Sequence, residues 1–141
     1  MAYRKKLYRT VQILEATTEK LKEALSADFE KRFEKEILVE IATKRFEYTF
    51  ESLWKFLKEL LLEEGIEANS PLGCFQESFK LKWIDPQQEE VFPLMVKKRN
   101  EIVHIYSEEE AFEIYLLIKN TFAQAIFDLF EKGKKRFSQK G

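Results

Sequence analysis

The sequence predicts an all-α protein, folded as an up-and-down antiparallel bundle of about five helices. Only 4 of its 141 residues are Gly and 3 are Pro, too few turn-forming residues for a β-sandwich. Hydrophobic residues make up 45% and charged residues 35%, and the apolar residues recur at the spacings of an amphipathic helix. The segments between these runs are short, which favours antiparallel neighbours. A chain of 141 residues is the size of one domain, so we expect a single helical domain over residues 1–141.

Two helices are expected in the N-terminal half. The first covers about residues 3–25, and residues 26–28 interrupt its pattern. The second is expected as one uninterrupted helix over about residues 29–64, ended by Gly65, because glycine is favoured just after a helix. Trp54 in this helix is interpreted as a core residue, and a base-stacking platform is the alternative. The two apolar faces comprise Leu7, Val11, Leu14, Leu21 and Leu25, and Ile41, Phe46, Phe50, Leu53, Trp54, Leu57, Leu60 and Leu61.

Two further helices are indicated by the residues at which they begin. Ser70, followed by proline, is a good N-cap for the third helix. The fourth is expected to begin at Asp85, with Gln88 at the capping-box position, and to run to about residue 105. Pro93 lies inside this helix and should kink or restart it, since proline cannot donate a backbone hydrogen bond.

The fifth helix is expected to begin at Ser107, with Glu110 as its capping-box partner, and to end near Gly133. From about residue 133 we expect a basic, loose tail. The N-terminus and residues 97–99 are also basic, and such groups can attract phosphates. A solvated surface is the alternative, and the net charge of −1 makes no case for nucleic-acid binding by the chain as a whole.

The single histidine, His104, and the single cysteine, Cys74, narrow the possible chemistry. One histidine excludes multi-histidine metal sites, and one cysteine excludes an internal disulfide and a CxxC zinc site. We interpret Cys74 as a buried small hydrophobe and not as a nucleophile. The chain shows no secretory signal and no window apolar enough to span a membrane. We therefore expect a cytoplasmic protein with no membrane contact, no metal and no cofactor.

Arg99 breaks the apolar pattern of the fourth helix. If the helix continues at 100° per residue, Arg99 lies in the middle of an apolar arc, where its guanidinium needs an anionic or hydrogen-bonding partner. Asn100 and His104 flank the arc, one turn apart. The structural alternatives are that Arg99 reaches the surface or pairs with a glutamate at the core edge, that His104 is an ordinary half-buried residue, and that Asn100 bonds to backbone or water. The arc consists of Phe92, Met95, Val96, Ile102, Val103 and Tyr106.

The string around Arg99 resembles a known family motif. Residues 99–106, RNEIVHIY, resemble the RX4HXY motif of the HEPN superfamily, in the branch of toxins associated with nucleotidyltransferases. Residues 45–55, RFEYTFESLWK, are similar to that branch's RFE-x-[TA]-F-E-x-x-W-K segment. Ser70 and Pro71 resemble the start of its next helix, and residues 106–115 resemble the continuation of its motif. The resemblance covers about half of the chain. Pro93 departs from the family pattern, in which a good helix former is usual.

The resemblance implies a helical bundle that dimerises through the motif helix and binds a minimal nucleotidyltransferase (MNT). It implies a toxin that is a metal-independent endoribonuclease, with RNA as substrate, 2′,3′-cyclic phosphate ends as product and the MNT as antitoxin. By motif position, His104 is the base or acid, Arg99 stabilises the phosphate, and Asn100 orients the phosphate or the histidine. One histidine per chain suffices if a two-fold dimer brings two sets of these residues into one cleft. Lys97 and Lys98, with Arg99, are the candidate RNA-binding residues.

Tyr106 is the tyrosine to which, by resemblance, the partner attaches AMP; the structural alternative is that it packs at the helix end. A non-catalytic subunit that binds nucleotide or substrate for the nucleotidyltransferase is the alternative function. A purely structural helical adaptor is the third possibility.

Overall fold

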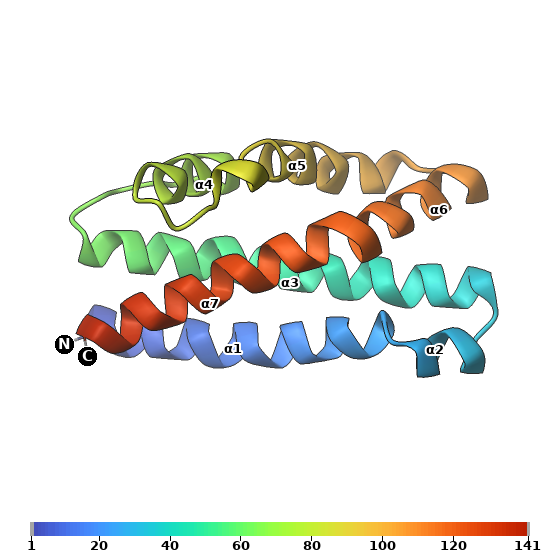
Figure 1. Cartoon of the computed structure of the whole chain (residues 1–141), viewed down its shortest axis with the longest axis horizontal. Coiled ribbons are helices and arrows are strands. Elements are labelled where there is room, and N and C mark those ends of the chain that lie inside the picture. Colours follow the sequence, from blue (N-terminus) through green and yellow to red (C-terminus); the bar gives the residue numbers. More distant parts are fainter. Residues whose placement is uncertain (1, 141) are drawn as a thin grey trace.

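The computed structural model describes residues 2–140 and is all-α over that range, without a strand, as predicted. Its α-helices are α1 (Ala2–Ala24), α2 (Ala27–Arg32), α3 (Lys35–Glu63), α4 (Pro71–Lys80), α5 (Val91–Glu101), α6 (Glu108–Leu117) and α7 (Ala123–Lys140). Figure 1 shows α1 and α3 side by side and antiparallel, α4 and α5 in line above α3, and α6 leading into α7, which crosses the bundle obliquely. The chain therefore passes along the bundle in alternating directions, first in α1, then in α3, then in α4 and α5, and last in α6 and α7. None of the described helices has both the length and the apolar character needed to cross a membrane.

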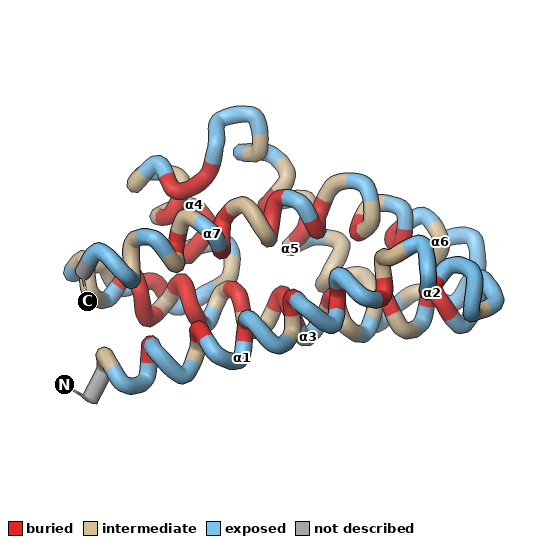
Figure 2. Tube along the Cα trace, turned by 60° about the horizontal axis from the view of Figure 1, so that its bottom comes forward, coloured by how far each residue is buried: buried red, intermediate tan, exposed pale blue. Residues whose placement is uncertain are grey.

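The core lies where the inward faces of α1, α3 and α7 meet, and Figure 2 shows the buried positions on those faces. Aromatic rings join the helices across it. Phe46 of α3 stacks on Phe122 with 5.7 Å between centroids, and Phe56 of α3 meets Phe130 of α7 edge-on at 5.6 Å. Each such pair contributes about 0.5–1.5 kcal/mol beyond the burial of its area. The largest side chains with less than 2% exposure include Leu7, Leu14, Leu21, Phe46, Phe50, Phe56, Phe92 and Phe122.

The single helix expected over residues 29–64 is two helices, so that prediction is wrong. Ser26 caps α2 by accepting a hydrogen bond from the backbone N–H of Phe29 (3.3 Å), and Phe33 ends it with an extended backbone (φ −124°, ψ 145°). The rings of Phe29 and Phe33 lie 4.9 Å apart and pack in a second apolar cluster at this end of the bundle. This tertiary packing, which periodicity along the chain does not reveal, decides where the helix breaks.

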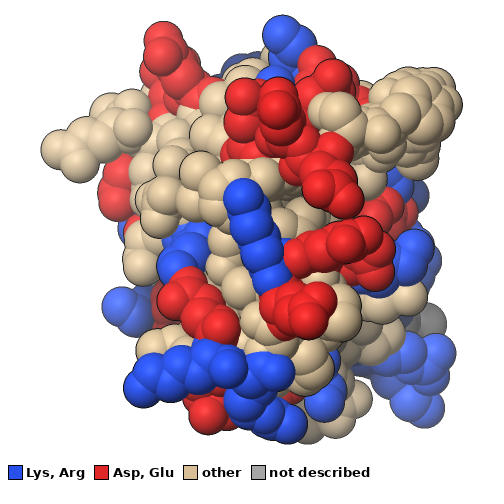
Figure 3. Space-filling view, turned by 90° about the vertical axis from the view of Figure 1, so that its right-hand side faces the viewer, with Lys and Arg blue, Asp and Glu red and all other residues tan. Residues whose placement is uncertain are grey.

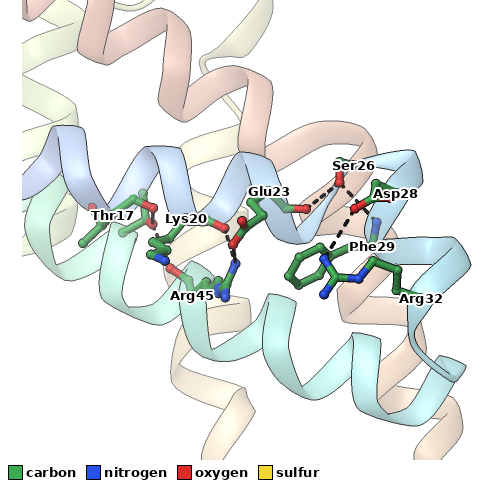
Figure 4. Close-up of polar contacts among 9 residues, drawn as sticks. Thr17, Lys20, Glu23, Ser26, Asp28, Phe29, Arg32 and Arg45 are labelled. Carbon is green, nitrogen blue, oxygen red and sulfur yellow. Dashed lines mark hydrogen bonds and ion pairs between the residues drawn. The ribbon is translucent and has the colours of Figure 1, made fainter.

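Arg45 of α3 fastens the same end of the bundle, as Figure 4 shows. Its guanidinium donates to the backbone carbonyl of Lys20 (2.8 Å) and pairs with Glu23 (2.9 Å), both on α1. It also lies 5.2 Å from the centre of the Phe29 ring of α2. The first residue of the RFE segment therefore has a structural role, in which it joins three helices.

Two of the predicted helix ends, at Gly65 and Ser70, match the structure, and the start predicted at Asp85 does not. Gly65 follows α3 with φ +76°, a conformation that favours glycine, and the Ser70 side chain caps α4 (3.0 Å). The capping box expected at Asp85 does not form, because Pro86–Gln88 makes only one 3₁₀ turn. The Gln88 side chain instead donates to Asp128 of α7 (3.0 Å), so a contact distant in sequence replaces the local cap.

The last helix is longer than predicted. From α6 the chain passes through a π turn at Ile118–Phe122 into α7, which continues beyond Gly133 to Lys140. The expected end at Gly133 is wrong, and the residues expected as a loose tail continue the helix. Packing explains the glycine, since a Cβ at Gly133 would lie 2.6 Å from the ring of Phe56.

Ion pairs with carboxylates hold the basic side chains near the two ends of the chain. These pairs favour the structural interpretation of the two groups, in which they fasten α1 and α7 to the rest of the bundle. The pairs are Arg4–Glu63 (2.7 Å), Lys6–Glu59 (3.1 Å), Lys132–Asp85 (2.6 Å), Lys134–Glu15 (3.8 Å) and Arg136–Glu64.

Replacement of Gly133 by alanine should destabilise the protein. An alanine in a helix is usually worth about 1 kcal/mol more than glycine, but here its Cβ would displace the buried Phe56 ring. We expect the free energy of unfolding to fall by about 1–3 kcal/mol in urea denaturation. The control, Ser138→Ala at an exposed position of the same helix, should change it by less than about 0.5 kcal/mol. A Gly133→Ala protein as stable as wild type would contradict this account of the packing.

Candidate functional site

The motif residues lie where α5 ends. α5 begins at Val91 with Pro93 in its first turn, where the missing N–H costs no hydrogen bond, so the helix restarts at this point. It ends at Glu101, earlier than predicted, and a 3₁₀ turn at Ile102–His104 follows.

Two local causes explain the early end of α5. Ser107 already caps α6, because its side chain accepts a hydrogen bond from the backbone N–H of Glu110 (3.1 Å), as predicted. The β-branched residues Ile102, Val103 and Ile105 also weaken helix formation. As a consequence, Tyr106 does not share a helix face with Arg99, and that expectation is wrong. Tyr106 is 90% exposed on the segment between α5 and α6.

Arg99 faces α3 and is half-buried there. Its Nη2 lies 3.5 Å from Oε2 of Glu51, and its Cζ lies 5.7 Å from the centre of the Phe50 ring. The same Glu51 oxygen accepts a hydrogen bond from the indole Nε1 of Trp54 (2.9 Å). The RFE segment and the RX4HXY motif, 48 residues apart between Glu51 and Arg99, therefore meet at one point. Of the structural alternatives for Arg99, pairing with a glutamate is the one observed.

The ion pair leaves part of the Arg99 guanidinium unused. Its Nε is buried and has no hydrogen-bond partner among the described residues. A buried donor without a partner costs about 1–3 kcal/mol. Arg99 therefore keeps a positive charge and hydrogen-bonding capacity that the fold does not satisfy.

Unlike the half-buried Arg99, both His104 and Asn100 are exposed to solvent. Neither makes a hydrogen bond or ion pair within the described part of the chain. Val103, next to His104, is 68% exposed, which is unusual for an apolar residue. Tyr106, which follows shortly in the chain, is also exposed. Within the described chain, then, no hydrogen bond or ion pair links Arg99, Asn100 and His104. Arg99 and Asn100 lie in the last turn of α5, and His104 lies in the 3₁₀ turn that follows it.

The candidate RNA-binding lysines differ in their surroundings. Lys97 is exposed, whereas Lys98 is half-buried and pairs with Glu101 one turn later (3.3 Å). No group of three or more His, Cys, Asp or Glu side chains suited to a metal ion occurs among the described residues.

An acidic hollow of about 700 Å³, which the sequence analysis did not identify, adjoins Tyr106. It lies between the start of α3 and the start of α6. Figure 3 looks at this end of the bundle, and acidic side chains gather in the upper part of that view. The run of three glutamates after Ser107 was the available signal. The carboxylates that line the hollow belong to Glu36, Glu40, Glu108, Glu109 and Glu113.

Cys74 is buried in α4, as predicted, with its Sγ 3.8 Å from the backbone carbonyl of Ala68. Burial raises the pKa of the thiol to about 11. Only about a thousandth of it is therefore ionised at pH 8, and the thiolate is the reactive form. This agrees with the interpretation of Cys74 as a small core residue.

The protein is thus an all-α bundle in which Arg99 lies in the last turn of α5 and His104 lies in the turn that follows. A family profile described as "Nucleotidyltransferase substrate binding protein like" matches residues 5–135. The chain belongs to this family, which confirms the resemblance drawn from its motifs. A crystal structure of a protein from Thermus thermophilus is similar, with a TM-score of 0.71 and 28% sequence identity over 88% of this chain and 98% of that chain. Comparison with curated proteins gives no significant match.

Two residues at the site were not assigned a role from the sequence. Glu51 was recognised only as part of a family segment, and Trp54 was interpreted only as a core residue; it is partly buried against the core. Their spacing of three places them on neighbouring parts of one helix face, which was the available signal. The contact with Arg99 depends on how α3 and α5 pack, and no local pattern contains that information.

Proposed function

We propose that this protein is a HEPN toxin, a metal-independent endoribonuclease that leaves 2′,3′-cyclic phosphate ends and is neutralised by a minimal nucleotidyltransferase. The observation that carries the proposal is the state of Arg99, a half-buried guanidinium with an unpartnered Nε, five residues before an exposed histidine. Membership of the nucleotidyltransferase substrate-binding family supports it.

The proposed chemistry uses the RNA 2′-OH as the nucleophile. His104 removes its proton, or protonates the leaving 5′-oxygen, since an imidazole exchanges protons near neutral pH. The 2′-oxygen attacks the adjacent phosphorus, and the bond to the 5′-oxygen breaks. Arg99 stabilises the negative charge that builds on the phosphate, and Asn100 orients the phosphate or the imidazole. Lys97 and Lys98 would hold the neighbouring phosphates.

A homodimer would complete this site. One imidazole cannot easily serve as base and acid in the same step, and a two-fold axis near the end of α5 would bring two copies into one cleft. The 68% exposure of Val103 supports an interface there, because an exposed apolar side chain is buried on assembly.

Tyr106 is the proposed site of modification by the partner. Its phenol is almost fully exposed, so an AMP-transferring enzyme could reach it without unfolding the chain. An attached AMP would add a negative charge and bulk beside the cleft and compete with RNA for Arg99.

The second candidate function is a non-catalytic subunit that binds nucleotide or substrate for the nucleotidyltransferase. The observation that favours it is that no hydrogen bond or ion pair links Arg99 and His104 within the described chain, together with the family description. In this case the Arg99 region is an anion-binding site without a catalytic histidine.

Substitution of either motif residue should abolish RNA cleavage in EDTA. We expect wild-type protein to cleave total RNA or tRNA, and Arg99→Ala and His104→Ala to cleave at least about 100-fold more slowly, because each removes a catalytic group. Gel analysis of the RNA measures the rates. Arg9→Ala, an exposed arginine of α1 remote from α5, is the control and should cleave as wild type. Equal cleavage by all variants, or none by wild type at any concentration, would contradict the proposal.

Growth of cells that lack the partner separates the two candidate functions. A ribonuclease toxin should stop growth when expressed alone, and His104→Ala should not. Co-expression of the nucleotidyltransferase should rescue cells carrying wild type but not those carrying Tyr106→Phe. Normal growth with wild-type protein alone would favour the binding subunit.

A charge at Val103 should disrupt the proposed dimer. In Val103→Asp two carboxylates would face each other near the two-fold axis and repel, so we expect a dimeric wild type and a monomeric variant in sedimentation velocity. Ile13→Asp, at a half-exposed position of α1, is the control and should remain dimeric. A monomeric wild type would contradict the two-fold cleft.

A further inference from the structure

Glu51, which the proposed mechanism does not include, lies between Trp54 and Arg99. Its Oε2 accepts the indole N–H of Trp54 (2.9 Å) and lies 3.5 Å from Nη2 of Arg99. Its other oxygen, Oε1, lies 4.0 Å from Nζ of Lys55. The contact with Trp54 is local to α3, whereas the contact with Arg99 crosses to α5.

The Trp54 hydrogen bond restricts the carboxylate. Trp54 is half-buried and packs against the core, so its indole N–H has a defined position at the core edge. A glutamate on a helix surface normally samples several rotamers, and this bond selects one that points toward α5. Glu51 is therefore oriented before any ligand arrives.

Arg99 depends on this orientation. An arginine side chain has about 2 kcal/mol of rotamer entropy to lose when it is ordered. Two contacts offset this entropic cost. They are the Phe50 ring, whose centre lies 5.7 Å from Cζ of Arg99, and the Glu51 carboxylate, which lies 3.5 Å from Nη2. The aromatic face tolerates many rotations of the guanidinium, whereas the Glu51 carboxylate attracts one end of it, at Nη2.

We propose that Glu51, held by Trp54, is a positioning residue that orients the Arg99 guanidinium for the phosphate. This rests on the proposed function of Arg99, but it assigns roles to two further residues on another helix. The carboxylate also offsets part of the Arg99 charge, so it weakens phosphate binding while it improves orientation. Removal of its charge should therefore affect binding and turnover in opposite directions.

The first test is Glu51→Gln, which keeps the size of the side chain and an oxygen for the Trp54 bond. We expect kcat for RNA cleavage to fall by about 10- to 100-fold, because a misplaced catalytic group costs about that much. We expect KM to stay unchanged or to fall by up to about threefold, because the substitution removes a negative charge that repels the phosphate. Trp54→Phe, which keeps an aromatic ring and loses the N–H, should lower kcat in the same way with little change in KM.

Glu47→Gln is the matched control. Glu47 lies one turn before Glu51 on α3 and makes no ion pair or hydrogen bond within the described residues, so its kcat and KM should equal those of wild type. A kcat for Glu51→Gln within twofold of wild type would overturn the proposal. So would a rise in KM with unchanged kcat, which would mean that Glu51 only supports binding.

A second readout does not depend on RNA cleavage. The buried Arg99 Nε–H should give a 15N-NMR signal protected from exchange with water, assigned by its loss in Arg99→Lys. Glu51→Gln should speed its exchange at least about tenfold and shift the Trp54 indole signal, while Glu47→Gln should change neither. Unchanged Arg99 exchange in Glu51→Gln would overturn the positioning role even if wild type cleaves RNA. Altered exchange in a protein that never cleaves RNA would support the positioning of Arg99 and count against the ribonuclease proposal alone.

Discussion

A guanidinium that cannot lose its charge lies at the edge of an apolar core, and the site is organised around that constraint. Arg99 cannot be buried without an anion nearby, and α3 supplies one in Glu51. Because the indole of Trp54 holds this carboxylate, the requirement extends into the packing of α3. Even so, the Nε of Arg99 lacks a partner among the described residues. The fold thus maintains an incompletely satisfied cation at its surface, a feature that suits the binding of phosphate.

The central position of α3 makes this arrangement possible. Its rings pack against those of the π turn and α7 on one side, while its Phe50 and Glu51 face Arg99 on another. Where α5 gives way to a 3₁₀ turn, Ile102 and Ile105 still pack against the core, whereas Val103, His104 and Tyr106 are exposed. The helix end therefore divides the motif into a half-buried part that holds charge and an exposed part suited to contact with other molecules.

Local chemistry accounts for what the sequence predicted well. The caps at Ser70 and Ser107 and the end at Gly65 each depend on a few adjacent residues, and all three are present. The errors arise where distant contacts decide. The break at Phe33 serves an apolar cluster at the bundle's end, and Gly133 makes room for a ring of α3 while its helix continues. For the site, the sequence identified Arg99 and His104 as motif residues but wrongly placed both on one helix, because α5 ends at Glu101. The Glu51 partner of Arg99 follows from helix packing.

The central claim is that this chain cleaves RNA through the RNA's own 2′-OH. It is tested most directly with a pool of synthetic RNA oligonucleotides and an identical pool carrying 2′-O-methyl groups, each incubated with wild-type protein in EDTA. Mass spectrometry then identifies the product ends. The account predicts 2′,3′-cyclic phosphate ends from the RNA pool and no cleavage of the methylated pool. Cleavage of the methylated pool, or products with 3′-hydroxyl and 5′-phosphate ends, would contradict it.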